Sequence, residues 1–147
     1  MYKNILVPID GSALSRSAAK EAAAFAKTQG AKMVGFYVAP AYQPDVYADF
    51  VPANFVSPKE YDELARKTAE KHLSVVEKAA EAAGVRCTCA HAMSDLPYEE
   101  IVKAAQRYKC DLIFMASHGR SGIARLLLGS QTSKVLARSK VPVLVHR

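Results

Sequence analysis

Two hydrophobic patterns alternate along this chain of 147 residues. The first is a short, nearly continuous apolar run, which is typical of a strand buried on both faces of a parallel sheet. The second places apolar residues at every third or fourth position, which is typical of a helix with one buried face. The apolar runs predict strands at residues 3–9, 32–39, 85–92, 112–115 and 141–146. The periodic segments predict helices at residues 13–29, 58–83, 94–108 and 130–139.

The predicted helices carry start and stop signals. Residues 57–60, Ser-Pro-Lys-Glu, form a capping box with proline at the first helical position. Gly30 is suited to end the first helix in a left-handed conformation. The Gly129-Ser130 pair predicts that the last helix opens on a hydroxyl cap.

The alternation of strands and helices predicts one α/β domain over residues 1–147. The expected architecture is a doubly wound, five-stranded parallel sheet with helices on both faces. With the strand order 3-2-1-4-5, the winding reverses between the first and fourth strands, and ligands of such sheets bind beyond the carboxyl ends at that reversal. The segments that meet there are residues 10–12, Asp-Gly-Ser, and residues 116–130.

The strongest candidate chemistry lies after the fourth strand. Residues 116–119, Ala-Ser-His-Gly, end the apolar run, and Gly129-Ser130 begins a helix. Glycine lets a backbone approach a ligand closely, and the free N–H groups at a helix N-terminus bind anions. The pattern favours a phosphate cradle opposite the carboxylate of Asp10, which suits a nucleotide. The alternative is an ordinary strand-to-helix connection whose glycines serve turn geometry.

The positive charge of the chain gathers near this stretch. Residues 1–111 carry 14 basic and 14 acidic side chains, whereas residues 112–147 carry six basic side chains and no acidic one, which accounts for the formal net charge of +6. An anionic ligand would be attracted there. Nucleic acid is disfavoured because the segment lacks interleaved aromatic residues for base stacking. A basic face that only keeps the protein soluble is the competing interpretation.

Other features restrict the class of protein. No apolar run reaches membrane-spanning length, and no leader pattern precedes the first strand, so the expected compartment is the cytoplasm. Cys87, Cys89 and Cys110 fit free thiols better than a disulfide framework. Cys87, Cys89 and His91 alternate along one strand face, where half-buried small side chains are favoured over a metal site. His72 falls on the apolar stripe of the long helix and is interpreted as a packed or boundary histidine.

Residues 40–57 have no regular pattern. This connection is long for a loop, and it contains several prolines and aromatic residues, among them Tyr42, Tyr47, Phe50 and Phe55. Long loops in compact domains tend to be functional or mobile. Its aromatic side chains are expected to pack on the domain, on a partner subunit or over a ligand.

Five sequence blocks resemble the universal stress protein family, in the order and at the spacing of that family. They are KNILVPIDGS, LPYEEIVKAA, CDLIFMASHGR, LLLGSQTSKVL and VPVLV, and the match extends over the whole chain. The fold that this resemblance implies is the Rossmann-like five-stranded sheet. ATP-binding members carry Gly, two residues, Gly, nine residues, then Gly and Ser or Thr. Gly119 and Gly129-Ser130 match the later positions, but Ala116 stands at the first.

The resemblance implies binding of ATP or AMP, with or without Mg²⁺, by a nucleotide-responsive dimer that acts in stress response. Asp10 would contact adenosine, and the backbone of Val38 would face adenine. The remaining candidates would wall the crevice or line the phosphates: Pro8, Ile9, Met115, Ala116, Ser117, His118, Gly119, Arg120, Gly129, Ser130, Gln131 and Thr132. The Ala116 methyl either weakens binding or is accommodated.

An alternative function is that of a family member without nucleotide binding that serves as a protein-interaction module. Catalysis is not predicted beyond slow ATP hydrolysis at most, because the chain has no G-x-x-x-x-G-K-[ST] sequence and His118 has no evident orienting partner. We assign no catalytic residue.

The last strand predicts a homodimer. Both of its faces are apolar, yet the expected strand order places it at a sheet edge with unpaired backbone groups. An antiparallel strand pair across a two-fold axis would close that edge, as is common in the family. The predicted interface residues are Val141, Pro142, Val143, Leu144 and Val145. Alternatively, residues 40–57 cover the edge within one monomer.

Overall fold

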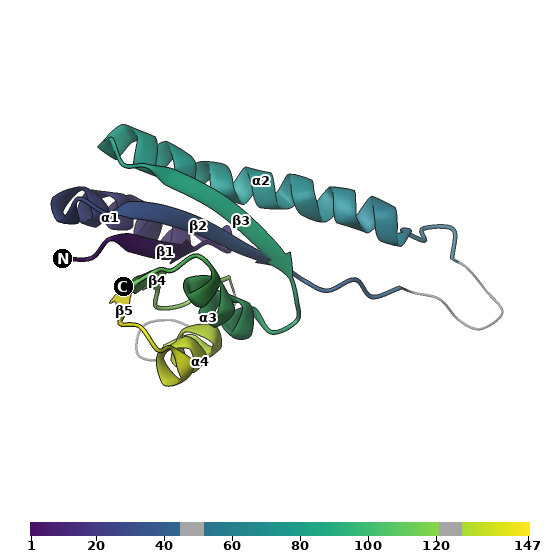
Figure 1. Cartoon of the computed structure of the whole chain (residues 1–147). Coiled ribbons are helices and arrows are strands. Elements are labelled where there is room, and N and C mark those ends of the chain that lie inside the picture. Colours follow the sequence, from purple (N-terminus) through teal and green to yellow (C-terminus); the bar gives the residue numbers. More distant parts are fainter. Residues whose placement is uncertain (45–51, 121–127) are drawn as a thin grey trace.

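The computed structural model describes residues 1–44, 52–120 and 128–147. In these ranges the strands and helices alternate as the hydrophobic pattern predicts (Figure 1). Their bounds are β1 (Asn4–Pro8), α1 (Ala13–Gln29), β2 (Lys32–Ala39), α2 (Pro58–Ala83), β3 (Cys87–Met93), α3 (Pro97–Arg107), β4 (Leu112–Ala116), α4 (Ser130–Arg138) and β5 (Val143–His146).

The five strands form one parallel sheet in the order β3-β2-β1-β4-β5, which confirms the predicted fold class. Leu6 of the central strand β1 lies in register with Val34 of β2 on one side and with Ile113 of β4 on the other. Helices α1 and α2 cover one face of the sheet, and α3 and α4 cover the other (Figure 1). The winding therefore reverses between β1 and β4, as expected.

Each face of the sheet has its own core because successive side chains of a strand point to opposite faces. Ile5 and Val7 of β1 are fully buried against α1 and α2. Leu6, between them, is fully buried in the cluster that includes Ile101 of α3 and Val135 of α4. This alternation holds the central strands rigidly, so the loops at their carboxyl ends start from fixed positions.

Most of the predicted helix ends are confirmed. At α2 the Ser57 side chain accepts a hydrogen bond from the Glu60 N–H at 3.2 Å, and the Ser57 N–H donates to the Glu60 carboxylate at 2.8 Å. Gly30 ends α1 with φ of 64°. The hydroxyl cap predicted for α4 is wrong, because its N-cap is Gly129, which has no side chain, and Ser130 is already helical.

Strand β5 begins two residues later than the pattern predicts. The cause is local, because the Val141 N–H is bonded to the Ser139 hydroxyl at 3.1 Å and Pro142 has no N–H to donate. The Pro142 carbonyl still accepts a hydrogen bond from the Ile113 N–H at 3.0 Å, so the chain is already aligned with β4 there.

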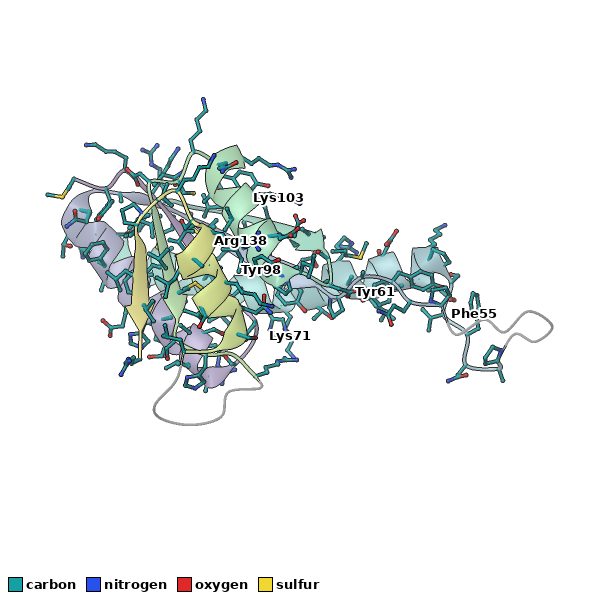
Figure 2. All side chains as sticks on the ribbon, turned by 90° about the horizontal axis from the view of Figure 1, so that it is seen from below. Phe55, Tyr61, Lys71, Tyr98, Lys103 and Arg138 are labelled. Carbon is teal, nitrogen blue, oxygen red and sulfur yellow. The ribbon has the colours of Figure 1, made fainter. Side chains whose placement is uncertain are left out.

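The described ends of the loop at residues 40–57 lie beside the first turns of α2. Tyr42 and Tyr61 pack with ring centroids 5.3 Å apart, and their hydroxyls donate to the carbonyls of Val56 and Pro40, each at 2.5 Å. This part of α2 extends past the sheet, and Phe55 and Tyr61 lie far from Arg138 of α4 (Figures 1 and 2). The described part of the loop therefore does not cover β5; Tyr47 and Phe50 lie outside the described residues.

Among the described residues, no helix is long and apolar enough to cross a membrane.

Candidate functional site

The carboxyl ends of β1 and β4 bring two segments together that are about a hundred residues apart in sequence. The Arg120 N–H, which follows β4, donates to the Asp10 carboxylate, which follows β1, at 3.2 Å. Gly119 lies so close that a Cβ atom placed there would overlap Asp10 Oδ2. The predicted meeting of Asp10 with the loop after β4 is therefore present, and glycine is required for the approach.

Asp10 is held by backbone and hydroxyl groups of the turn that follows β1. Its carboxylate accepts a hydrogen bond from the Ser12 N–H at 2.9 Å, and its own N–H donates to the Ser15 hydroxyl at 3.4 Å. Burial would raise the pKa of Asp10, but the hydrogen bonds from Ser12, Ser15 and the Arg120 N–H outweigh it and hold that pKa below its ordinary value. Asp10 is therefore a carboxylate at neutral pH.

The start of α4 is tied to the end of β4. The Gly129 N–H donates to the Ser117 carbonyl at 2.7 Å, and the Thr132 hydroxyl donates to the Ala116 carbonyl at 2.9 Å. A Cβ atom at Gly129 would lie 3.0 Å from the Cα atom of His118 and 3.2 Å from the Ser117 oxygen. The last glycine of the motif, Gly129, thus serves a close contact between two backbone segments.

The first turn of α4 can receive an anion. Its N-cap Gly129 makes no side-chain hydrogen bond, the turn contains no acidic residue, and Ser130 is exposed. The first N–H groups of a helix have no partner within the helix, and the helix dipole makes this end positive. These properties make this helix end chemically suited to an anion, and the anion site predicted from the glycine pattern stays a prediction.

The structure separates the predicted site residues into two groups. Residues 117–120 contact Asp10 on one side and Gly129, beside Ser130, on the other, so these residues lie together at the carboxyl ends of β1 and β4. Gln131 and Thr132 direct their side chains elsewhere, since the Gln131 amide oxygen accepts a hydrogen bond from the Tyr98 N–H at 3.0 Å and Thr132 is buried. Only their backbone groups remain available to a ligand.

The remaining predicted residues lie at or near the carboxyl ends of β1, β2 and β4. Pro8 and Val38 are half-buried near the ends of β1 and β2. Ile9, Met115 and Ala116 are buried, with Ile9 and Ala116 in the core under α1 and α2 and Met115 in the core on the other face. The Ala116 methyl is therefore part of the packed interior.

His118 does not form a catalytic arrangement with the described residues. Its Nδ1 atom lies 3.2 Å from the hydroxyl of the adjacent Ser117, and no described carboxylate is bonded to it. In the described ranges, no group of three or more His, Cys, Asp or Glu residues could hold a metal ion. Cys87, Cys89 and Cys110 are free thiols.

The structure adds His72 and Tyr37, which sequence reasoning did not connect with the site. His72 of α2 is only 9% exposed and packs against Tyr37 of β2, with ring centroids 5.1 Å apart. A Cβ atom placed on Gly11 would overlap Cε1 of His72 and lie 2.8 Å from Arg120 Nη2. The helical period predicts that His72 is buried, but only the crossing of α2 over the β1–α1 turn shows what it faces.

A parallel sheet that reverses its winding between β1 and β4, with a carboxylate and a helix N-terminus both held against the residues after β4, defines a doubly wound α/β protein. The family model described as the universal stress protein family matches residues 1–147, and the chain belongs to this family.

Individual relatives agree with this assignment. Universal stress protein MJ0531 of Methanocaldococcus jannaschii is 37% identical over 147 residues, which cover 99% of this chain and 82% of the relative. The solved structure of MJ0577 from the same organism has 28% identity and a TM-score of 0.74, and the match covers 99% of this chain and 95% of that one. A universal stress protein solved in complex with cAMP has 27% identity and a TM-score of 0.71, with 99% and 97% coverage.

Proposed function

We propose that this protein binds an adenine nucleotide, ATP or AMP, in the crevice between β1 and β4, and that it acts in stress response. The observation that carries the proposal is that residues 117–120 contact both the N-terminus of α4 and the Asp10 carboxylate. The cAMP complex of a family member supports an adenine nucleotide as the class of ligand.

The proposed roles follow from the chemistry of each group. The Asp10 carboxylate accepts hydrogen bonds from the sugar, and the backbone near Val38 faces the adenine ring. The N–H groups of the first turn of α4, at Ser130, bind phosphate oxygens, and Mg²⁺ would bind through the phosphates. Hydrolysis is not part of the proposal, because no described base is oriented toward this point.

A protein-interaction module without nucleotide is the second candidate. It is favoured by the state of Asp10, which already accepts hydrogen bonds from the Ser12 and Arg120 N–H groups and can be satisfied without a ligand. A nucleotide would have to share or displace the Arg120 bond.

Calorimetric titration with ATP, in the presence and absence of Mg²⁺, tests the proposal. Ser130→Asp should lower the affinity at least tenfold, because it places a negative charge where the phosphates bind. The same charge stabilises a helix N-terminus, so the variant should fold as well as the parent protein. Ser130→Asn is the matched control without charge and should bind nearly as the parent does. Undetectable binding to the parent at millimolar ATP would favour the interaction module.

The proposal includes a homodimer through β5. Pro142 and His146 direct their carbonyls to β4, where they accept hydrogen bonds from the Ile113 and Ser117 N–H groups at 3.0 and 2.8 Å. Backbone groups of successive residues point to opposite sides of a strand, so Val143 and Val145 direct theirs to the open edge. A second copy of β5 could satisfy them. The cytoplasm is the proposed compartment, because free thiols are typical of reducing surroundings.

A further inference from the structure

Two of the cysteines lie side by side on β3, which is an edge strand of the sheet (Figure 1). Cys87 and Cys89 are two positions apart, so their side chains point to the same face of the strand, the one that α1 and α2 cover. Both are half-buried, whereas Cys110 is buried in the core on the other face. The pair therefore presents two adjacent thiols at the sheet edge that is farthest from β5.

Gly35 of β2 makes room for the two sulfur atoms. It lies in register with Cys89, and a Cβ atom placed on it would lie 3.0 Å from Cys89 Sγ and 3.1 Å from Cγ1 of Val76. The Gly35 N–H also interacts with the sulfur atom of Cys87. A glycine inside a strand often marks a place where another group approaches closely. Here the missing side chain lets the sulfur atoms of Cys87 and Cys89 converge over β2.

The two thiols interact directly with each other. The hydrogen bond between them is the main cause that lowers the pKa of Cys87, and the same hydrogen bond, together with burial, raises the pKa of Cys89. Cys87 Sγ also lies 3.5 Å from the Thr88 carbonyl oxygen, and Cys89 Sγ lies 4.0 Å from that of Leu73. Thiols are weak hydrogen-bond donors, so these contacts leave both sulfur atoms free to bind a metal ion.

The strand geometry does not suit a disulfide between Cys87 and Cys89. Residues two positions apart on a parallel strand have Cα atoms about 6.6 Å apart, and their Cβ atoms point in the same direction, so the Cβ atoms are separated by a similar distance. A disulfide needs Cβ atoms about 3.5–4.5 Å apart. An ion placed between the two sulfur atoms bridges the larger separation without bending the strand.

The number and kind of ligands select the class of ion. A structural Zn²⁺ site takes four ligands, and within the described ranges no group of three or more His, Cys, Asp or Glu residues could hold a metal ion. Two thiolates are enough for a soft monovalent ion with linear coordination, and copper(I) prefers such ligands. The negative charge of Glu77 on α2 acts on both thiols, which favours a cation over an anionic reagent at this point.

We propose that Cys87 and Cys89 form a two-coordinate site for a soft monovalent metal ion, copper(I), whose two ligands are their sulfur atoms. Binding replaces the two thiol protons, which pass to the solvent, with two metal–sulfur bonds, and the copper stays in the +1 state. Because β2 separates β3 from β1 and β4, the inference does not rest on the proposed nucleotide site.

Anaerobic titration of the reduced full chain with copper(I), in competition with the chromophoric ligand bicinchoninate, tests the proposal. The parent protein should take up one copper ion per chain. Cys87→Ser and Cys89→Ser should each lower the affinity by about a hundredfold or more, because a hydroxyl is a poor ligand for a soft ion. Cys110→Ala is the matched control and should bind as the parent does, because burial raises the pKa of Cys110 to about 12 and keeps that thiol protonated.

X-ray absorption of the copper-loaded parent protein provides a readout that needs no variant. It should show two sulfur atoms in the first coordination shell and no nitrogen or oxygen atom. A nitrogen or oxygen ligand would overturn the two-coordinate assignment. A parent protein that does not remove copper(I) from bicinchoninate, or serine variants that bind as tightly as the parent, would overturn the site itself.

Gly35→Ala tests whether the convergence of the sulfur atoms matters. The added methyl would lie 3.0 Å from Cys89 Sγ and displace it, so the affinity for copper(I) should fall by about tenfold or more. Gly30→Ala is the control, because its methyl meets nothing within 4 Å, and it should leave this affinity unchanged. Equal affinities would overturn the role of Gly35. If Gly35→Ala does not fold, the serine variants and the absorption spectrum still decide the proposal.

Discussion

The hydroxyl of Thr132 donates a buried hydrogen bond of 2.9 Å to the carbonyl oxygen of Ala116. Ala116 is the last residue of β4, and Thr132 lies in the first turn of α4. The bond therefore fixes the helix N-terminus against the strand that ends at the crevice. It is a structural role for a residue that the family resemblance placed among the candidate nucleotide-binding residues.

Replacing this hydroxyl should weaken both the fold and the site. Thr132→Val leaves the buried Ala116 carbonyl without its partner, which should lower the free energy of unfolding by about 1–3 kcal/mol. Because α4 is then less firmly positioned, the affinity for ATP should fall several-fold. Thr132→Ser keeps the hydroxyl and is the control. Urea denaturation and calorimetry measure the two effects, and a Val variant as stable as the Ser variant would contradict the role assigned to the bond.

Two glycines with left-handed backbones offer a matched comparison. Gly11→Ala and Gly30→Ala both place a methyl at positive φ, which should cost about 1 kcal/mol each. At Gly30 the methyl meets nothing within 4 Å, whereas at Gly11 it meets His72 and Arg120. Thermal unfolding should therefore show a clearly lower Tm for Gly11→Ala. Equal losses would mean that His72 does not close on the turn.

Ala116 departs from the glycine of the ATP-binding motif, and its methyl is packed in the core. Ala116→Gly should lower the free energy of unfolding by about 1 kcal/mol, because it removes a buried methyl and adds backbone freedom to the unfolded chain. The affinity for ATP, measured by calorimetry, should change by less than about twofold. A gain of tenfold or more would show that the methyl obstructs the nucleotide.

The proposed dimer requires the outward backbone groups of β5. Val145→Pro removes one outward N–H and leaves the hydrogen bonds to β4 in place, so the variant should be monomeric by light scattering at micromolar concentration. Val145→Thr keeps the N–H and the β-branched shape, and it should remain dimeric. A parent protein with monomer mass would refute the dimer without reference to either variant.

Two lowered pKa values predict how stability depends on pH. Because folding lowers the pKa of His72, its contribution is complete above about pH 6.5 and is lost as the pH falls through the lower folded value. The contribution of Asp10 is likewise present above about pH 3.9 and is lost in stronger acid. Urea denaturation should show stability decreasing from about pH 7 to pH 5. His72→Gln should remove much of this decrease, and Asp10→Asn should change only the acidic part.

The fold could be predicted from the hydrophobic pattern alone. Apolar runs such as that of β4 can be buried only between two helical layers, and the periodic segments supply these layers, so the doubly wound sheet follows from local pattern. The capping box at Ser57 and Glu60 and the glycine end at Gly30 were predictable for the same reason, since each depends on neighbouring residues alone. The N-cap of α4 could not be predicted in this way, because Gly129 and Ser130 are both acceptable N-cap residues and the local sequence does not choose between them.

Several contacts at the carboxyl ends of β1 and β4 follow from the packing of distant segments and not from the sequence pattern. The expected strand order predicts that Asp10 meets the loop after β4, but the spacing of Gly119 and Gly129 does not show that Gly129 packs on the backbone of Ser117 and His118. The glycine spacing also does not show that the Thr132 hydroxyl bonds to the buried Ala116 carbonyl. His72 is the clearest case: its burial follows from the helical period of α2, whereas its position beside Gly11 depends on how α2 crosses α1. Contacts between residues far apart in sequence are set by packing, which no local pattern encodes.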